Sequence, residues 1–239
     1  MNNLQKSDNK ARERRILDVT RDLIIRYGYD KMSMNDIADA AGISKGAIYL
    51  HFASKDELFE AIFYREFRAY AATWYARILA DPQGGTIGGI YQAVLYAVNS
   101  NPFITAVVKK DPRVLGTYLR KPNNIFANMT APGLLDEMVV ALQEAGVIRR
   151  DLEPLLITHI MDMLSYGLVA LPDQKAADAI PPFDDLLATI AEMLDRLLTP
   201  PAGADSAAGK RVIAAWAGKI ESYFDGVEAT QDVAKEDAR

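Results

Sequence analysis

Apolar residues recur along nearly the whole chain at the spacing of amphipathic helices, with short polar breaks between the repeats. In residues 12–27 the repeat includes Leu23, Ile24 and Tyr27, which share one helix face, and it ends at Gly28. No stretch alternates apolar and polar residues over the length of a strand. The pattern therefore predicts an all-α fold.

Breaks rich in proline and glycine separate the later repeats. The predicted helices cover residues 55–79, 87–100, 102–109, 113–119, 123–128, 134–145, 153–171 and 183–198. Residues 199–209 have the composition of a flexible linker. An extra amphipathic helix at 210–225 should dock either on the chain's own body or on a partner subunit, and the polar residues 226–239 are expected to be disordered.

Residues 33–58 hold two short capped helices joined by a glycine turn. Ser33 can cap a helix whose third position is Asp36, and Gly42 is placed to end that helix in the left-handed conformation. Ser44 can then cap a second helix. This is the outline of a helix-turn-helix DNA-binding unit.

The second of these helices has only a small inner face. Ile48 and Phe52 point inward, whereas the outward and flanking positions are Gly46, Ala47, Leu50, His51, Lys45 and Tyr49. Such a short helix is not stable alone, so its outward surface is the part that matters for function. Ser54 caps a third helix, where Lys55 and first-turn amides can hold a phosphate.

The motif resembles that of a known family. The matching residues are Ile37-Ala38, Ala41-Gly42-Ile43-Ser44, Gly46, Ile48-Tyr49, His51-Phe52, Ser54-Lys55 and Leu58. In type and spacing they resemble the N-terminal domain of TetR/AcrR bacterial transcriptional regulators, over residues 10–60. The resemblance implies a three-helix DNA-binding domain at 1–54, with a basic N-terminal arm, joined to a larger helical effector-binding and dimerisation domain at 55–198.

The resemblance also implies roles for single residues. Phosphate contacts fall on Ser33, Tyr49, His51 and Lys55, and base-facing positions on Asn35, Lys45, Gly46 and Ala47; Ser44, as the cap, and Leu50 complete the predicted DNA-binding set. Gly46, Ala47 and Leu50 carry no hydrogen-bonding side chains, whereas Lys45 can donate to guanine and Asn35 can pair with adenine, so direct readout should be sparse. Operator shape and dimer spacing on a near-palindromic double-stranded site should then contribute much of the specificity.

A plainer interpretation of this set stays open. The two serines cap helices whether or not DNA is present, and His51 or Tyr49 could simply pack on the domain.

Charge is divided unevenly along the chain, whose net charge is −5. Residues 1–55 hold ten Lys or Arg and seven Asp or Glu, whereas the rest holds 17 basic and 25 acidic residues. Arg12, Arg14 and Arg15 could reach phosphates. The local excess of positive charge coincides with the motif and favours contact with a polyanion.

The remainder of the chain should hold a dimer interface and an effector pocket, as in the resembled family. The two helices at 153–171 and 183–198 are the candidates for the homodimer contact. The candidate pocket residues are Phe67, Tyr70, Trp74, Tyr91, Phe103, Tyr118, Phe126, Met129, Asp162 and Tyr166. They suit an apolar or aromatic small molecule, although such side chains are also common in plain cores.

A polar stripe within 153–171 has two interpretations. It consists of Thr158, Asp162, Ser165 and Tyr166 at helical spacing. It could orient a ligand, or it could be hydrogen-bonded structure at a subunit interface. The second interpretation is preferred, because buried polar groups are usually paired for structural reasons.

Several classes of function are disfavoured. The chain has no cysteine and two histidines, His51 in the motif and His159, which is expected to be packed in an apolar helix. Neither has the spacing of a metal or nucleophile site, so no cofactor is expected. The polar N-terminus lacks a signal-peptide core, and the apolar run 155–171 is short and interrupted, so a cytoplasmic protein without membrane contact is expected.

The expected function is a homodimeric repressor, released from its operator by an apolar or aromatic effector. The alternative is a family-like DNA-binding or adaptor protein controlled by a protein partner. A helical enzyme is the weakest alternative.

Overall fold

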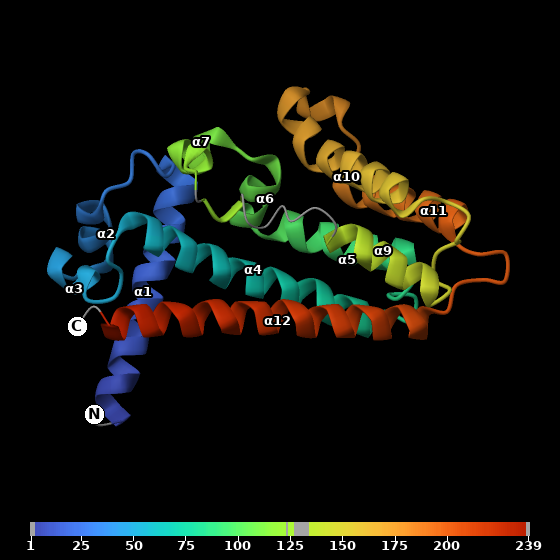
Figure 1. Cartoon of the computed structure of the whole chain (residues 1–239). Coiled ribbons are helices and arrows are strands. Elements are labelled where there is room, and N and C mark those ends of the chain that lie inside the picture. Colours follow the sequence, from blue (N-terminus) through green and yellow to red (C-terminus); the bar gives the residue numbers. More distant parts are fainter. Residues whose placement is uncertain (1–2, 123, 127–133, 238–239) are drawn as a thin grey trace. The chain divides into compact units, whose positions relative to one another are not determined.

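The computed structural model describes residues 3–122, 124–126 and 134–237, and every regular element among them is a helix (Figure 1). The all-α prediction is therefore confirmed for the described part of the chain. The chain forms two compact units, which we call the head unit (Met1–Phe67 with Asn101–Ala131) and the body unit (Arg68–Ser100 with Pro132–Arg239).

The head unit contains the N-terminal helices and a later segment. Its elements are α1 (Asn3–Tyr27), α2 (Met34–Ala41), α3 (Lys45–Tyr49), the first part of α4 (Lys55–Ala80), α6 (Pro102–Lys109), α7 (Pro112–Leu115) and the 3₁₀ helix η1 (Gly116–Arg120). Helix α1 begins earlier than residue 12, because no proline or glycine interrupts the preceding sequence. The predicted helix at 113–119 is split into α7 and η1 at Gly116, which has φ +52°.

A tyrosine after α1, and not the one within it, enters the core of the head unit. Tyr27, predicted on the inner face, is 49% exposed, with the Arg26 guanidinium over its ring. Tyr29 is buried instead. The reason is the turn at Gly28, whose φ of +83° ends α1. A Cβ there would overlap the carbonyl oxygen of Arg113, so the position also requires glycine for close packing.

The body unit contains the other helices. They are the rest of α4, α5 (Ile87–Ser100), α9 (Leu134–Glu144), α10 (Pro154–Ala170), η2 (Leu171–Gln174), η3 (Ala177–Ala179), α11 (Phe183–Leu198) and α12 (Ser206–Asp237). Helices α5 and α11 pack together, and the Asp195 carboxylate accepts a 2.8 Å hydrogen bond from the Gly88 amide. The predicted helix at 123–128 lies partly outside the described residues.

Helix α12 docks on the chain's own body unit. Its apolar face buries Ile213 and Trp216, and it runs beside the body-unit part of α4, residues 68–80 (Figure 1). The Lys210 ammonium donates to the Asp81 carbonyl at 2.6 Å, close to the end of α4. Near the other end of the contact, Arg68 pairs with Asp225 at 2.9 Å.

The bounds of α12 differ from those predicted. The helix begins at Ser206, inside the expected linker 199–209, and continues to Asp237 through most of the expected disordered tail. The Ser206 hydroxyl accepts a 3.1 Å hydrogen bond from the Gly85 amide. That tertiary contact fixes the first turn, and no proline follows Pro201 to end the helix.

Helix α10 is covered on one face only. Ile157 and Leu168 are buried, whereas Leu156 is 51% and Met163 57% exposed. His159, expected to be packed, is exposed on the uncovered side. The face of α10 that carries Ile157 and Leu168 packs against α9 and α11, and the face that carries Leu156 and Met163 is exposed.

Among the residues that the structure describes, one segment, Pro154–Gln174, is long and apolar enough to cross a membrane by length and composition, with a mean hydropathy of 1.5 and 28% of the tested window buried. The same properties belong to helices packed in a protein interior or interface. One face of this helix packs against α9 and α11, and the other face is exposed.

Candidate nucleic-acid interface

Helix α2 begins and ends as its sequence predicts. The Ser33 hydroxyl accepts a hydrogen bond from the Asp36 amide at 3.2 Å, and the Ser33 amide donates to the Asp36 carboxylate at 2.8 Å. The Ser33 hydroxyl also donates to the Asp36 carboxylate at 2.6 Å, and this bond, followed by the one from the Ser33 amide, lowers the pKa of Asp36. Gly42 ends the helix with φ +64°. The turn that leads into α3 is thus fixed locally.

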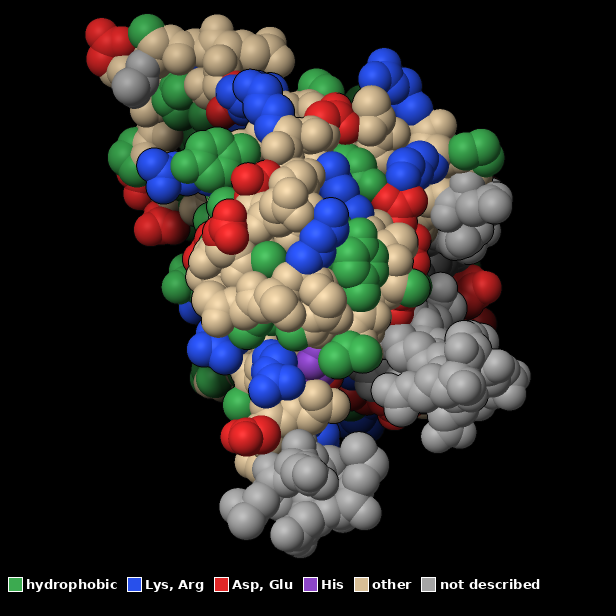
Figure 2. All heavy atoms as spheres, turned by 90° about the vertical axis from the view of Figure 1, so that its left-hand side faces the viewer, with side chains coloured by type: hydrophobic (Ala, Val, Ile, Leu, Met, Phe, Trp, Pro, Cys, Tyr) green, Lys and Arg blue, Asp and Glu red, His purple; other side chains and the backbone are tan. Residues whose placement is uncertain are grey.

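The recognition helix α3 is anchored by two side chains and presents the rest outward. Ser44 caps it, accepting from the Ala47 amide at 3.2 Å. Ile48 and Phe52 are buried, whereas Leu50 is 74% exposed. Figure 2 faces the side on which α2 and α3 lie in Figure 1, and Lys and Arg side chains lie there among hydrophobic ones. A helix of five residues with one exposed side is suited to contact another molecule.

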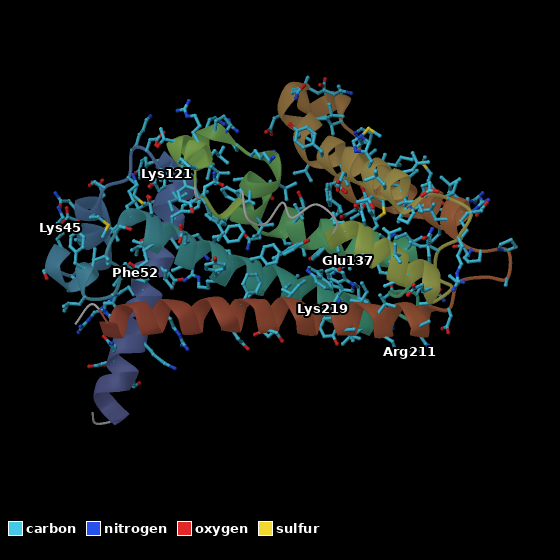
Figure 3. The ribbon with its side chains drawn as sticks, viewed as in Figure 1. Lys45, Phe52, Lys121, Glu137, Arg211 and Lys219 are labelled. Carbon is cyan, nitrogen blue, oxygen red and sulfur yellow. The ribbon has the colours of Figure 1, made fainter. Side chains whose placement is uncertain are left out.

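The predicted DNA-binding residues lie in the head unit, on α2, α3, their caps and the start of α4. Exposed members are Ser33, Asn35, Ser44, Lys45, Gly46, Tyr49 and Leu50, and half-buried members are Ala47, His51 and Lys55. Figure 3 shows Lys45 at the outer edge of these helices. The set therefore offers both polar and apolar contacts.

Tyr29, which the sequence did not single out, joins Lys55 to a distant segment. The Lys55 ammonium lies 4.1 Å from the Tyr29 ring centroid, and the Lys121 ammonium lies 5.5 Å from it. Lys121 donates to the Tyr29 hydroxyl at 3.2 Å and also to the Asp56 carboxylate, which accepts from the tyrosine as well. We call these four residues the Tyr29 cluster.

The titration of the Tyr29 cluster follows from its burial and hydrogen bonds. Burial, and then the hydrogen bond to Asp56, raise the pKa of Tyr29 to about 12. Burial alone would raise the pKa of Asp56, but the hydrogen bonds from Lys121 and Tyr29 lower it overall. Burial lowers the pKa of Lys55, and the nearby Lys121 charge acts in the same direction. At neutral pH the cluster therefore holds one carboxylate and a neutral phenol beside lysines.

Two further contacts tie residues 110–121 to the N-terminal helices. The Tyr29 amide donates to the Val114 carbonyl at 2.8 Å. The Asp30 carboxylate accepts from the Thr117 amide at 3.0 Å and from its hydroxyl, and these bonds lower the pKa of Asp30. Tyr29, Asp30 and Thr117 are not among the residues that the sequence pattern predicted for this site. The sequence shows that residues 109–121 are rich in lysine and arginine, but it does not show that this segment lies beside Tyr29.

Some of the predicted effector residues form a ring cluster in the head unit. Phe103 and Tyr118 are buried against Phe59, with centroid separations of 5.8 and 4.2 Å. Phe126 contacts the Tyr118 ring at 6.0 Å. Phe67 stacks on Phe63. Burial raises the pKa of Tyr118, whose hydroxyl donates to Glu60 at 2.9 Å.

The other effector residues that the structure describes lie in the body unit. Trp74 and Tyr91 are buried, Tyr70 is half-buried, and Asp162 and Tyr166 are exposed. The Ser165 hydroxyl lies 3.4 Å from that of Tyr91, so part of the polar stripe on α10 contacts α5. Met129 lies outside the described residues. The predicted pocket residues are thus divided between the two units.

An apolar cavity of about 370 Å³ lies in the body unit between α10, α11 and the connection 171–181. Its lining includes Leu168, Ile180 and Ile190, with Lys175 as the charged residue among the lining side chains. It contains none of the predicted effector residues. In the described part of the chain, no group of three or more His, Asp or Glu residues could hold a metal ion.

Comparison with known proteins identifies the N-terminal motif. Residues 16–62 match the model of "Bacterial regulatory proteins, tetR family". An HTH-type transcriptional repressor of Mycobacterium tuberculosis is 48% identical over 52 residues, which cover 22% of this chain but only 28% of the relative. The A-factor receptor protein of Streptomyces griseus is 39% identical over 187 residues, 77% of this chain and 62% of the relative.

Solved structures show the same fold. The transcriptional regulator FadR of Bacillus subtilis, solved in complex with stearoyl-CoA, superposes with a TM-score of 0.57 at 20% identity, covering 75% of this chain and 96% of that one. At this identity the likeness concerns the fold alone: an N-terminal helix-turn-helix domain followed by a helical C-terminal domain.

Proposed function

Because the chain belongs to the TetR/AcrR family of DNA-binding transcriptional regulators, and is therefore not an enzyme, we propose that it acts as a homodimeric repressor on a near-palindromic operator. A small apolar or aromatic effector would release it. A regulator that binds operator DNA must have access to the chromosome, so we propose that the protein is cytoplasmic and not bound to a membrane.

The observation that carries the proposed DNA contact is the exposed side of α3. Its inner anchors, Ile48 and Phe52, are fully buried, so Tyr49 and Leu50 on its outer side are available to a partner. Lys45 and Asn35 would contact base edges, while Ser33, Tyr49, His51 and Lys55 would hold phosphates, close to the caps of α2 and α4.

The DNA contact can be tested by selecting bound fragments from a random duplex pool. The selected duplex should bind the wild type, and Lys45→Ala/Tyr49→Ala/Lys55→Ala should weaken binding at least 100-fold by losing phosphate and base contacts. A matched control substitutes Lys175, Tyr96 and Lys219, which are exposed in the body unit. Both variants should keep the wild-type helical signal and dimer mass. Unchanged binding by the head-unit variant would refute the proposed interface.

The proposed dimer contact uses the uncovered sides of α10 and α11. Leu156, Met163 and Tyr166 lie at helical spacing on α10 and are 51–57% exposed, and Met193 and Leu197 of α11 are 58% and 52% exposed. Apolar residues gathered in this way are typical of a subunit interface. Asp162 and Tyr166 would then be polar groups of that interface, in line with the preferred interpretation of the stripe.

The proposed effector contact is supported by the relative named as a receptor for A-factor. The chain's two tryptophans allow a sharp test. In a Trp216→Phe variant, Trp74 is the remaining tryptophan. A compound bound against Tyr70, Trp74 and Tyr91 should change its emission and raise the melting temperature. A compound that raises the melting temperature without changing Trp74 emission binds elsewhere, for example in the α10–α11 cavity.

Control by a protein partner is the alternative outcome. If no compound of an apolar and aromatic library shifts the melting temperature while a protein partner does, the small-effector proposal is wrong.

A further inference from the structure

The positive charge of the head unit comes from a segment outside the DNA-binding motif. Residues 1–67 contain eleven Lys or Arg and eleven Asp or Glu, and therefore carry no net charge. Residues 101–131 add five basic residues and one acidic residue. The basic residues are Lys109, Lys110, Arg113, Arg120 and Lys121. We call residues 109–121 the basic segment.

The basic segment lies next to a predicted phosphate-contacting residue. Lys121 and Lys55 both lie against the Tyr29 ring, and their like charges interact. Figure 3 shows Lys121 near the end of α1, in the same region as α7. Asp56 and the Tyr29 hydroxyl hold the Lys121 ammonium, so this lysine positions the segment beside the start of α4.

Other cations of the segment are accessible. Lys110 ends α6 with φ +50° and is exposed, as is Arg120, and the Arg113 side chain is 79% exposed. A groove of about 630 Å³ runs between the end of α1 and α7, and cations from both sides line it: Arg26 and Lys31 from one, Arg113 from the other. The segment and the N-terminal helices thus contribute positive charge to one groove.

The carboxylates that line the groove already have partners. Asp30 accepts hydrogen bonds from Thr117, and Asp111 pairs with Arg113 at 2.8 Å. The Arg113 side chain remains largely exposed despite its partner, and Arg26 and Lys31 are exposed as well. Asp30 keeps its negative charge, because Thr117 is neutral, so the three cations and two carboxylates that line the groove leave it a net charge of +1.

We propose that the basic segment is a second contact surface for the DNA backbone, with Lys110, Arg113 and Arg120 reaching phosphates beyond those held by the helix-turn-helix motif. This rests on the proposed function. The reason for choosing DNA is continuity: the segment joins the predicted phosphate site at Lys55 through the Tyr29 ring. Because backbone contacts carry no sequence information, the segment would add affinity and salt dependence without changing the selected sequence.

The test measures affinity for the selected duplex over a range of salt concentrations. Each phosphate contact contributes about 0.9 to the slope of log K against log salt. Lys110→Gln/Arg113→Gln/Arg120→Gln should therefore lower the slope by about 2 to 3 and select the same sequence. The charge-keeping variant Lys110→Arg/Arg113→Lys/Arg120→Lys should restore most of the slope.

A control of equal charge separates a contact from a general field effect. Lys175→Gln/Arg196→Gln/Arg211→Gln removes three exposed cations of the body unit and should leave the slope unchanged. An equal loss in both triple variants, or no loss in the head-unit triple, would overturn the inference. If that triple melts below the wild type, the single Arg120→Gln variant is used, with an expected loss of about 1 in slope.

The two proposals fail in different ways. If the wild type selects no duplex, the proposed function and this inference are both wrong. If the wild type binds a selected duplex and the triple variant keeps its slope, only the inference is wrong.

Discussion

At the scale of single residues, Tyr29 shows how a side chain outside any motif can organise a site. Its hydroxyl donates to the Asp56 carboxylate and accepts from Lys121, while its ring lies under the Lys55 ammonium. The result is a buried ring that connects α4 to the segment following α7. The orientation of Lys55 in the proposed interface therefore depends on a residue that would not itself contact DNA.

The Tyr29 cluster makes stability depend on pH in a defined direction. Tyr29→Phe should lower the free energy of unfolding at pH 7 by about 1–2 kcal/mol, because the charged Asp56 carboxylate loses the hydrogen bond that the Tyr29 hydroxyl donates to it. The folded-state pKa of Tyr29 is raised to about 12 from an ordinary value near 10. The contribution of its hydroxyl to stability is therefore complete at pH values below 10 and is lost as the pH rises toward 12.

Denaturant unfolding of both proteins at pH 7 and at several values between pH 9 and 12 measures this effect. The difference between wild type and Tyr29→Phe should shrink as the pH rises. A difference that stays constant over that interval would show that the hydroxyl does not titrate within the cluster.

At the scale of elements, α3 is a helix that depends on its anchors. Five residues cannot stabilise a helix by backbone hydrogen bonds alone, so the burial of Ile48 and Phe52 holds it in place. The outer residues then contribute little to folding and are available for recognition.

Substitutions on the two sides of α3 should therefore have opposite consequences. Ile48→Ala should lower the free energy of unfolding by about 2–4 kcal/mol, because it leaves a cavity under the helix. Leu50→Ala should change it by less than about 0.5 kcal/mol and weaken operator binding instead. Urea unfolding and duplex titration of both variants provide the measurements. If Leu50→Ala destabilised the protein as much as Ile48→Ala, the outward orientation of Leu50 would be wrong.

Helix α12 offers a second comparison, between two of its glycines. A Cβ at Gly209 would overlap the Gly85 carbonyl, whereas a Cβ at Gly218 meets no atom within 4 Å. Gly209→Ala should thus separate the start of α12 from the body unit and lower the melting temperature. Gly218→Ala should stabilise the helix by about 0.5–1 kcal/mol through the better helix propensity of alanine.

Thermal unfolding and limited proteolysis can follow the two glycine variants. Cleavage should occur within or near α12 in Gly209→Ala and remain at the wild-type level in Gly218→Ala. Equal behaviour of the two variants would contradict the close packing of α12 at Gly85.

At the scale of the whole molecule, charge and apolar surface are separated between the units. The head unit carries a net positive charge, contributed by residues 101–131, and the body unit carries the acidic excess. The body unit also exposes the apolar sides of α10 and α11. This division suits a protein that binds DNA with one unit and a second copy of itself with the other.

The proposed dimer predicts the effect of a charge on each of the two interface helices. Leu156→Glu/Met193→Glu should yield a monomer and weaken operator binding, because two half-sites would no longer be bound together. Leu135→Glu/Leu79→Glu, at exposed positions of α9 and α4, is the matched control and should stay dimeric. Sedimentation and duplex titration measure both properties. A double variant of α10 and α11 that remains dimeric would place the interface elsewhere.

The sequence by itself determined the elements that depend on neighbouring residues. Capping by Ser33 and Ser44, the left-handed turn at Gly42 and the apolar repeats are local signals, so α2, α5 and α11 lie where they were predicted. Helix α3 begins after Ser44 as predicted but ends at Tyr49, before Phe52. The same local signals carried the resemblance to the regulator family.

The tertiary structure alone decided which distant segments meet. Local periodicity placed Tyr27 inside and gave no role to Tyr29, Lys121 or the basic segment, because their contacts join residues 27 to 92 positions apart. Local periodicity also left the docking site of α12 open. The helix packs on the chain's own body unit, where Lys210 contacts Asp81 and Arg68 pairs with Asp225. Such contacts depend on close packing and on paired polar groups, which no spacing along the chain encodes.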